Sequence, residues 1–277
     1  MKIITKTKEL KNILGSINNL SESIGLVLTM GNIHAGHLSL IKEAQNNNKL
    51  VITSIFINPT QFDNDDDYKS YPKTLDQDIV KLKSSNCDLL YLPTVHEIYP
   101  KGLVIEKSTL KYRNILCDGH RPDHFDGVTT VVNTFFDIIK PKNSYFGEKD
   151  YQQMKLIDEM VKIKKIDVNV VSCLSIRDKN GMSLSSRNSN FTQKQSEIFE
   201  SLAKKIKLLV KTLKKNNLKA NFNQFKKELS KININKIDYL EIRDEKNLEI
   251  TSNHHHARLF IAVFIDKIRI IDNFKLY

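Results

Sequence analysis

An uncharged apolar run, Ile24-Gly25-Leu26-Val27-Leu28, leads through the turn Thr29-Met30-Gly31-Asn32 into His34-Ala35-Gly36-His37. The run is typical of a strand buried on both faces of a parallel sheet, and apolar side chains recur near helical spacing from Ala35 onward. The two histidines therefore fall at the start of a helix, where the positive helix end, unpaired backbone N–H groups and imidazoles all favour phosphate. These features predict a triphosphate site, although the spacing alone leaves open an ordinary, partly buried histidine pair.

Strands and amphipathic helices alternate through the first two thirds of the chain. This alternation indicates βαβ units, which build a parallel sheet with right-handed crossovers. We expect strands at 24–28, 50–57, 88–92, 144–146 and 168–173, and helices from about 35 and at about 75–84, 128–139 and 151–162. Residues 1–175 are predicted to form an α/β domain with a Rossmann-like, doubly wound parallel sheet.

The chain changes character near residue 175. Residues 176–277 carry 21 Lys and Arg against 11 Asp and Glu, so most of the formal charge of +11 lies there. Thr192 and Gln195 have the spacing of a capping box that opens a long basic helix. We expect a second helix near 221–229 and strands at 237–242, 257–265 and 268–271, the last two joined as a hairpin by Asp266-Lys267. Residues 176–277 are therefore predicted to form a second, smaller α+β domain.

The lysines of the long helix raise the question of nucleic acid or an anionic membrane. They alternate with Ile206, Leu209, Val210 and Leu213, which form a buried stripe, and no aromatic side chains lie between them to stack on bases. A solvated helix face is the favoured interpretation, with neither nucleic acid nor membrane as a partner.

The cysteines and the N-terminus bear on the cellular compartment. Cys87, Cys117 and Cys173 are odd in number and widely separated, which fits reduced thiols rather than a disulfide framework. The first residues lack the apolar core of a signal peptide, and no apolar run has the length of a membrane span. We expect a cytoplasmic protein.

Three further stretches carry polar side chains where strands or turns end, which is where ligands collect in such sheets. Residues 58–62 offer two amides, residues 146–153 offer Lys149 for a phosphate and Asp150 for ribose hydroxyls, and residues 184–188 offer Arg187 as a phosphate clamp. Taken singly, these stretches can also be an ordinary turn, a capped helix and a surface turn.

Two other stretches suggest metal sites but do not meet their requirements. Residues 63–67 resemble half of a calcium loop, yet Tyr68 and Thr74 stand where glycine and glutamate are needed, so a solvated acidic loop is expected. His254-His255-His256 has no second ligand cluster, and neighbouring residues of a strand point to opposite faces.

Together the motifs resemble the pantothenate synthetase (pantoate–β-alanine ligase) family of the HIGH-motif nucleotidylyltransferase superfamily. The matching stretches run in family order across nearly the whole chain: 29–37, 54–62, 71–74, 121–128, 145–153 and 184–188. Three positions depart from the usual family pattern: Leu28 replaces a common proline, Ala35 an acidic residue and Lys73 an arginine.

The resemblance implies an AMP-forming acid–amine ligase. Such an enzyme condenses (R)-pantoate with β-alanine at the expense of ATP, through pantoyl adenylate and pyrophosphate, with Mg²⁺ held mainly by phosphates and water. The resemblance also implies a homodimer, and a C-terminal domain that closes over the active site.

The resemblance assigns roles residue by residue. His37, His34, Lys149 and Arg187 would be catalytic, Gln61 and Gln153 would bind pantoate, and Gln61 would also bind β-alanine. The positions implied to bind ATP are Met30, Gly31, Asn32, Ile33, His34, Ala35, Gly36, His37, Gly147, Glu148, Lys149, Asp150, Ile176, Leu184, Ser185, Ser186 and Arg187. It assigns no protein ligand to Mg²⁺.

Two alternatives remain at this stage. Another HIGH-motif cytidylyl- or adenylyltransferase would keep His34 and His37 but has no reason to carry Gln61 and Gln153 after separate strands. An RNA-binding protein would depend on the C-terminal lysines, so its binding would fall steeply with salt and survive His37→Ala.

Overall fold

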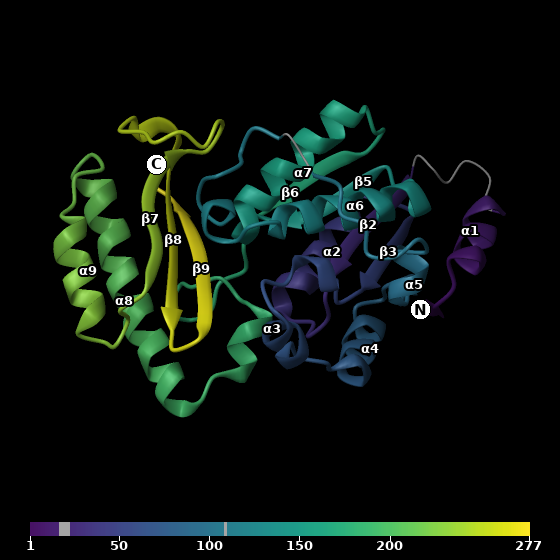
Figure 1. Ribbon diagram of the computed structural model, residues 1–277, viewed down its shortest axis with the longest axis horizontal. Coiled ribbons are helices and arrows are strands. Elements are labelled where there is room, and N and C mark those ends of the chain that lie inside the picture. The colour runs from purple at the N-terminus through teal and green to yellow at the C-terminus, as the bar shows by residue number, and fades with distance from the viewer. Residues whose placement is uncertain (17–22, 108–109) are drawn as a thin grey trace. The chain divides into compact units, whose positions relative to one another are not determined.

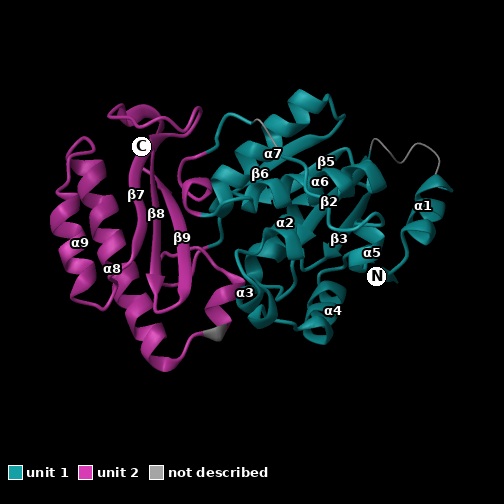
Figure 2. Cartoon of the chain, in the orientation of Figure 1, with its two compact units in different colours: residues 1–113, 121–176 teal, residues 114–120, 177–277 magenta. Residues whose placement is uncertain are grey.

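A computed structural model describes residues 1–16, 23–107 and 110–277, which form two compact units (Figure 2). Unit 1 comprises Met1–Arg113 and Arg121–Ile176, and unit 2 comprises Asn114–His120 and Arg177–Tyr277. The chain therefore passes between the units three times, and the short segment Asn114–His120 belongs to unit 2 although unit 1 flanks it in sequence. Two roles stay predictions: that residues 1–175 form the nucleotide- and pantoate-binding domain, and that residues 176–277 close over the active site.

Unit 1 is built on a six-stranded sheet in the order β1-β4-β3-β2-β5-β6, and its neighbouring strands pair in parallel (Figure 1). This confirms the predicted α/β fold. The strands are β1 (Lys2–Ile4), β2 (Ile24–Thr29), β3 (Leu50–Ile55), β4 (Leu89–Tyr91), β5 (Asn143–Gly147) and β6 (Asn169–Cys173).

The helices of unit 1 include the four expected from periodicity. The helices are α1 (Thr7–Gly15), α2 (Ala35–Asn47), α3 (Asp65–Ser70), α4 (Leu75–Ser84), α5 (Val95–Ile98), α6 (His124–Ile139) and α7 (Tyr151–Lys164). The pattern did not predict β1, α1, α3 or α5, which are short elements with few positions to establish a period.

The strand order reverses beside β2. Strands β3 and β4 extend the sheet on one side of β2, whereas β5 and β6 extend it on the other. Leu26 pairs with Ile52 of β3 and with Ser144 of β5, so the carboxyl ends of these three strands lie at one edge. A reversal of this kind opens the crevice in which doubly wound sheets bind ligands.

Buried apolar side chains hold β2 at the centre of unit 1. Val27 is fully buried and belongs to a cluster with Ile41 of α2, Val51 of β3, Leu90 of β4 and Tyr145 of β5. Burial on both faces explains the uncharged run that begins at Ile24.

Unit 2 contains the smaller α+β arrangement expected from the sequence. Strands β7 (Ile237–Asp244), β8 (Ala257–Ile265) and β9 (Ile268–Lys275) form an antiparallel sheet in that order, and Asp266-Lys267 joins the last two. Helices α8 (Gln193–Lys215) and α9 (Phe222–Ser230) accompany the sheet, and the capping box of Thr192 and Gln195 is present.

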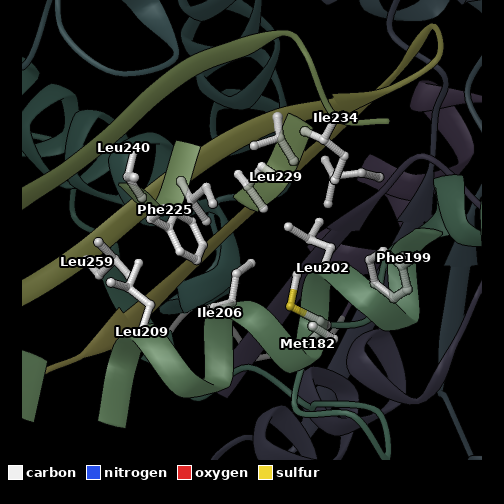
Figure 3. Packing of buried hydrophobic residues seen from close by; sticks show 14 of the residues in the cluster. Met182, Phe199, Leu202, Ile206, Leu209, Phe225, Leu229, Ile234, Leu240 and Leu259 are labelled. Carbon is white, nitrogen blue, oxygen red and sulfur yellow. The ribbon is translucent and has the colours of Figure 1, made fainter. Parts of the chain in front are cut away.

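The apolar faces of these elements form the core of unit 2. Figure 3 shows Leu202, Ile206 and Leu209 of α8 packed with Phe225 and Leu229 of α9. Burial of this stripe confirms that the lysines of α8 alternate with core residues, as an amphipathic helix requires.

Two local predictions were wrong. Most of the acidic stretch expected as a loop forms helix α3, because the Asn64 side chain caps its first turn and three aspartates there complement the helix dipole. The run His254–His256 forms a 3₁₀ turn before β8 rather than part of a strand.

The helices and cysteines bear on membrane spans and disulfides. In residues 1–16, 23–107 and 110–277, no helix is long and apolar enough to span a bilayer. The three cysteines are free thiols.

Candidate active site

The turn after β2 presents the two histidines. Gly31 has a φ of +84°, and Asn32 also adopts a left-handed conformation with a φ of 49°. Glycine is favoured at position 31 because of this positive φ, and a Cβ there would also lie 3.1 Å from the Asp78 carboxylate. The turn ends at His34, the N-cap of α2.

His34 and His37 cap each other at the start of α2. The Gly36 N–H donates to His34 Nδ1 over 3.1 Å, and the His34 N–H donates to His37 Nδ1 over 3.4 Å. The two rings stack with centroids 4.0 Å apart. A Cβ on residue 36 would lie 2.9 Å from Cε1 of His34, so a larger residue than Gly36 would displace this ring.

This capping determines which ring nitrogens donate. Because Nδ1 of each neutral imidazole accepts a backbone N–H, the ring proton resides on Nε2. Both rings therefore offer an Nε2–H donor away from the helix backbone.

The surroundings keep both imidazoles neutral. Burial is the main cause that lowers the pKa of His34 to about 4, and the positive charges of Lys149 and Lys81 add to the shift while Asp150 opposes it. Burial, together with His34 and the same two lysines, lowers the pKa of His37 to about 3. Near neutral pH the site thus combines two uncharged donors with two nearby cations.

The backbone contributes less to this site than the sequence predicts. The N–H groups of Asn32 and Ile33 donate to Asp78, and those of His34 and Gly36 donate to the imidazoles. The expectation that unpaired N–H groups favour phosphate here is therefore wrong for these four groups. The Nε2–H groups of the imidazoles, which these four hydrogen bonds do not use, take over the role of donors.

Gln61 lies in the 3₁₀ turn Pro59–Gln61 after β3, beside Met30. Its Oε1 accepts from Asn58 Nδ2 over 3.0 Å, and its Nε2 donates to Met30 Sδ over 3.2 Å. Asn58 is buried, and its Oδ1 accepts from the Tyr99 hydroxyl over 2.8 Å. Of the two amides noted in the sequence, Asn58 is therefore the buried one and orients Gln61, whose Nε2 lies beside Met30.

Helix α6 and the residues just before it contact the same turn. His124 Nδ1 lies 2.6 Å from the Gln61 carbonyl oxygen, and Arg121 Nη2 donates to that oxygen over 3.3 Å. A Cβ on Gly127 would lie 2.2 Å from the Thr60 carbonyl oxygen, so only glycine permits this approach. Sequence reasoning assigned no role to His124 or Gly127.

The stretch after β5 supplies the cation. Residues Glu148–Asp150 form a 3₁₀ turn, and Lys149 Nζ lies 3.2 Å from Asp150 Oδ1. A Cβ on Gly147 would meet no described atom within 4 Å, so close protein packing does not require this glycine. Gln153 is half-buried in the first turn of α7.

The remaining candidates lie in unit 2, apart from Ile176, the last residue of unit 1. The Ser185 side chain accepts from the Arg187 N–H over 3.3 Å and caps the turn Ser186–Asn190. Just before it, Ser183 Oγ donates to Asp272 of β9 over 2.7 Å. Leu184, Ser185, Ser186 and Arg187 thus form one loop anchored to the sheet of unit 2.

The structure therefore brings together, within unit 1, Met30 with Gln61 and the two histidines with Lys149. Asp78 and Lys81 of α4 join them and were missed. A signal was available, because Asp78 precedes the buried Leu82 by four residues, and a carboxylate on the apolar face of a helix is seldom without a partner. In the described part of the chain, no three His, Cys, Asp or Glu side chains are grouped to hold a metal.

Comparisons with known proteins agree with this architecture. A family described as "Pantoate-beta-alanine ligase" matches residues 2–275. A pantothenate synthetase of Thermosipho africanus is 39% identical over 99% of both chains. Among solved structures, a pantothenate synthetase of Thermus thermophilus has a TM-score of 0.88 at 30% identity and covers both chains fully. A Francisella tularensis pantoate-beta-alanine ligase, described as complexed with β-γ ATP and β-alanine, has a TM-score of 0.87 at 38% identity, covering 100% of this chain and 98% of its own.

Proposed function

Because the chain belongs to the pantoate–β-alanine ligase family, we propose that its histidine pair binds the phosphates of ATP while pantoate is activated at the neighbouring glutamines. Membership makes the protein an enzyme, an acid–amine ligase of pantothenate biosynthesis. The site residues, their order of action and the metal are the proposed part.

The first step is adenylation. A carboxylate oxygen of pantoate attacks the α-phosphorus of ATP, the bond from that phosphorus to the bridging oxygen of the β-phosphate breaks, and pyrophosphate leaves with its electron pair. A carboxylate is already a competent nucleophile, so the enzyme has to align the reactants and stabilise charge on the phosphates rather than supply a strong base.

The second step is amide formation. The neutral amine of β-alanine attacks the carbonyl carbon of pantoyl adenylate, loses a proton, and displaces AMP. We assign β-alanine to Gln61, as in the family. The solved Francisella tularensis relative carries β-alanine by its description, which supports a β-alanine site in this chain.

The observation that carries the proposal is the capped and stacked histidine pair at the carboxyl edge of β2. Their Nδ1 atoms accept from backbone N–H groups, so each neutral ring keeps its proton on Nε2 and can donate there. Lys149 adds a positive charge close enough to lower the pKa of both rings. Donors and cations of this kind stabilise charge that develops on a leaving pyrophosphate.

The other roles follow the family assignments. Met30 through His37 and Gly147 through Asp150 would bind ATP in unit 1, with Ile176, Leu184, Ser185, Ser186 and Arg187 completing the set. Gln61 and Gln153 would bind pantoate, and an amide N–H of Gln61, whose Oε1 already accepts from Asn58, suits its oxygen atoms. Mg²⁺ would enter with ATP, held by phosphate oxygens and water, as this ion usually is at nucleotide sites.

The homodimer and the cytoplasmic location remain proposals carried by the family resemblance. Light scattering on the purified protein measures the first, and fractionation of the native cell measures the second. Binding of nucleic acid, which is not expected, is measured by the salt dependence of RNA retention.

The decisive experiment follows pyrophosphate release from ATP with and without (R)-pantoate, and then AMP and pantothenate after β-alanine is added. We expect release to require pantoate and pantothenate to form only after β-alanine. Release by folded protein that is independent of pantoate would contradict the proposal and favour another nucleotidylyltransferase.

A further inference from the structure

Two side chains of α4 form hydrogen bonds with the backbone of Asn32 and Ile33, in the turn that leads to the histidines. Asp78 Oδ1 accepts from the Ile33 N–H over 2.7 Å, and Asp78 Oδ2 accepts from the Asn32 N–H over 2.9 Å. Lys81, one helical turn further along, donates from Nζ to the Ile33 carbonyl oxygen over 2.7 Å. The two side chains thus hold Ile33 from both sides, through its N–H and its C=O.

The backbone that these side chains hold has two successive residues in the left-handed region. Gly31 and Asn32 both have positive φ values, a conformation that costs free energy for a non-glycine residue such as Asn32. Hydrogen bonds to an ionised carboxylate are among the stronger ones, and Asp78 makes two of them to this turn. The Ile33 carbonyl and the His34 N–H belong to the same peptide bond, and this N–H donates to His37 Nδ1. The contacts from Asp78 and Lys81 therefore reach the peptide bond that contacts the imidazole pair.

Both carboxylate oxygens of Asp78 accept hydrogen bonds from protein donors. It is 1% exposed, and Oδ2 also accepts from the Thr74 hydroxyl over 3.1 Å. A buried carboxylate is tolerated when donors surround it, as they do here. The carboxylate is therefore occupied by protein donors rather than directed at a ligand.

Lys81 has a second influence on the same rings. Its positive charge is among the causes that lower the pKa of both His34 and His37. A charge on α4 therefore helps to hold the imidazoles in the neutral state that their capping arrangement requires.

We propose that Asp78 and Lys81 are positioning residues for adenylation, which act by holding Ile33 so that the Nε2–H groups of His34 and His37 face the phosphates. The inference rests on the proposed function of the histidine pair. Neither residue need touch the substrate for this role.

The test uses variants with matched controls on the same helix. Lys81→Met removes the donor and the charge at similar length, and Lys81→Arg keeps both. Asp78→Asn keeps the shape but places an amide donor against a backbone donor. Lys83→Met and Asp76→Asn change exposed residues of α4 and serve as controls.

Two readouts are taken on the full-length enzyme. The first is kcat and KM for pantoate-dependent pyrophosphate release. The second is the ¹⁵N chemical shifts of the imidazole nitrogens, which report tautomer and protonation without substrate. We expect Lys81→Met and Asp78→Asn to lower kcat about tenfold to a hundredfold, the range for loss of a charged hydrogen bond, with KM for pantoate changed less than threefold. In Lys81→Met the ¹⁵N titrations of both rings should move to higher pH, whereas Lys81→Arg and both controls should resemble the wild type.

The outcomes separate the inference from the function on which it rests. If wild-type protein releases no pyrophosphate with pantoate, the proposed function fails. The ¹⁵N shifts of wild type and variants still report whether Asp78 and Lys81 control the tautomer and protonation of the two imidazoles. An active wild type whose kcat and imidazole shifts survive Lys81→Met would overturn the inference. A lower kcat with unchanged imidazole shifts and a reduced melting temperature would overturn it too, because the role would then be structural. Should Asp78→Asn fail to fold, Lys81→Met decides.

Discussion

Lowering the pH should reduce the free energy of unfolding through His34 and His37, and variants can separate this contribution from that of the other titrating groups. Both imidazoles have pKa values below the ordinary 6.5, at about 4 and about 3. Below pH 6.5 the unfolded chain therefore binds protons at these two positions while the folded chain does not. Stability then falls as pH falls, from 6.5 until the folded pKa values are reached.

The size of the effect follows from the two pKa values. Each pH unit below 6.5 costs about 1.4 kcal/mol per imidazole while the folded ring stays neutral. At pH 5, about 1.5 units below 6.5, the loss is about 2 kcal/mol for each ring and about 4 kcal/mol for the pair.

Variants that keep the capping but cannot titrate isolate this contribution. Asparagine is a favourable N-cap, and glutamine at the third helical position completes a capping box, so His34→Asn and His37→Gln preserve acceptors for the backbone N–H groups. Between pH 7.5 and pH 5 the double variant should lose about 4 kcal/mol less unfolding free energy than the wild type, and His37→Gln alone about 2 kcal/mol less.

The assay is urea unfolding followed by circular dichroism at the two pH values. His96→Gln, at an exposed position on α5, is the control and should lose as much as the wild type. If His37→Gln lost as much free energy as the wild type on acidification, the folded ring would titrate normally. The conclusion that burial and the nearby positive charges hold the pKa of His37 well below its ordinary value would then be refuted.

Three further substitutions test the site and its support. His37→Ala should reduce pantoate-dependent pyrophosphate release by orders of magnitude with the circular dichroism spectrum preserved, and near-normal turnover would remove its assigned role. Gln153→Ala should raise KM for pantoate more than it weakens ATP binding, as measured by steady-state kinetics and calorimetry, and equal losses would contradict its placement. Gly127→Ala should lower the urea midpoint by the equivalent of about 2 kcal/mol or more, because its Cβ would lie 2.2 Å from the Thr60 carbonyl oxygen. The control is Gly15→Ala, where a Cβ would meet no described atom within 4 Å. Equal midpoints for the two variants would show that α6 can shift away from Thr60 without loss of stability.

The support around the site shows where prediction from the sequence ended. His34, His37 and Gln61 could be singled out because each follows a recognisable strand and lies in a family motif. Asn58 was interpreted as a possible ligand-binding amide, yet it is buried and orients Gln61. The buried position of Asn58 involves a hydrogen bond from Tyr99, 41 residues further along the chain, so the sequence around Asn58 does not reveal it.

By itself the sequence determined the features that neighbours within about four residues control. These include the buried run of β2, the capping box that opens α8, and the turn at Asp266-Lys267 between β8 and β9. Periodicity and capping act over one or two helical turns, so they can be recognised without the fold.

Only the tertiary structure decided how the histidine pair works. The Asp78 carboxylate that receives the Ile33 N–H lies 45 residues away in sequence, and the burial that lowers the pKa of His37 depends on the packed surroundings of α2. The membership of Asn114–His120 in unit 2 is likewise a matter of spatial contact. Burial, charge and backbone satisfaction at a site are properties of segments that meet only after folding, and no local pattern encodes their distances.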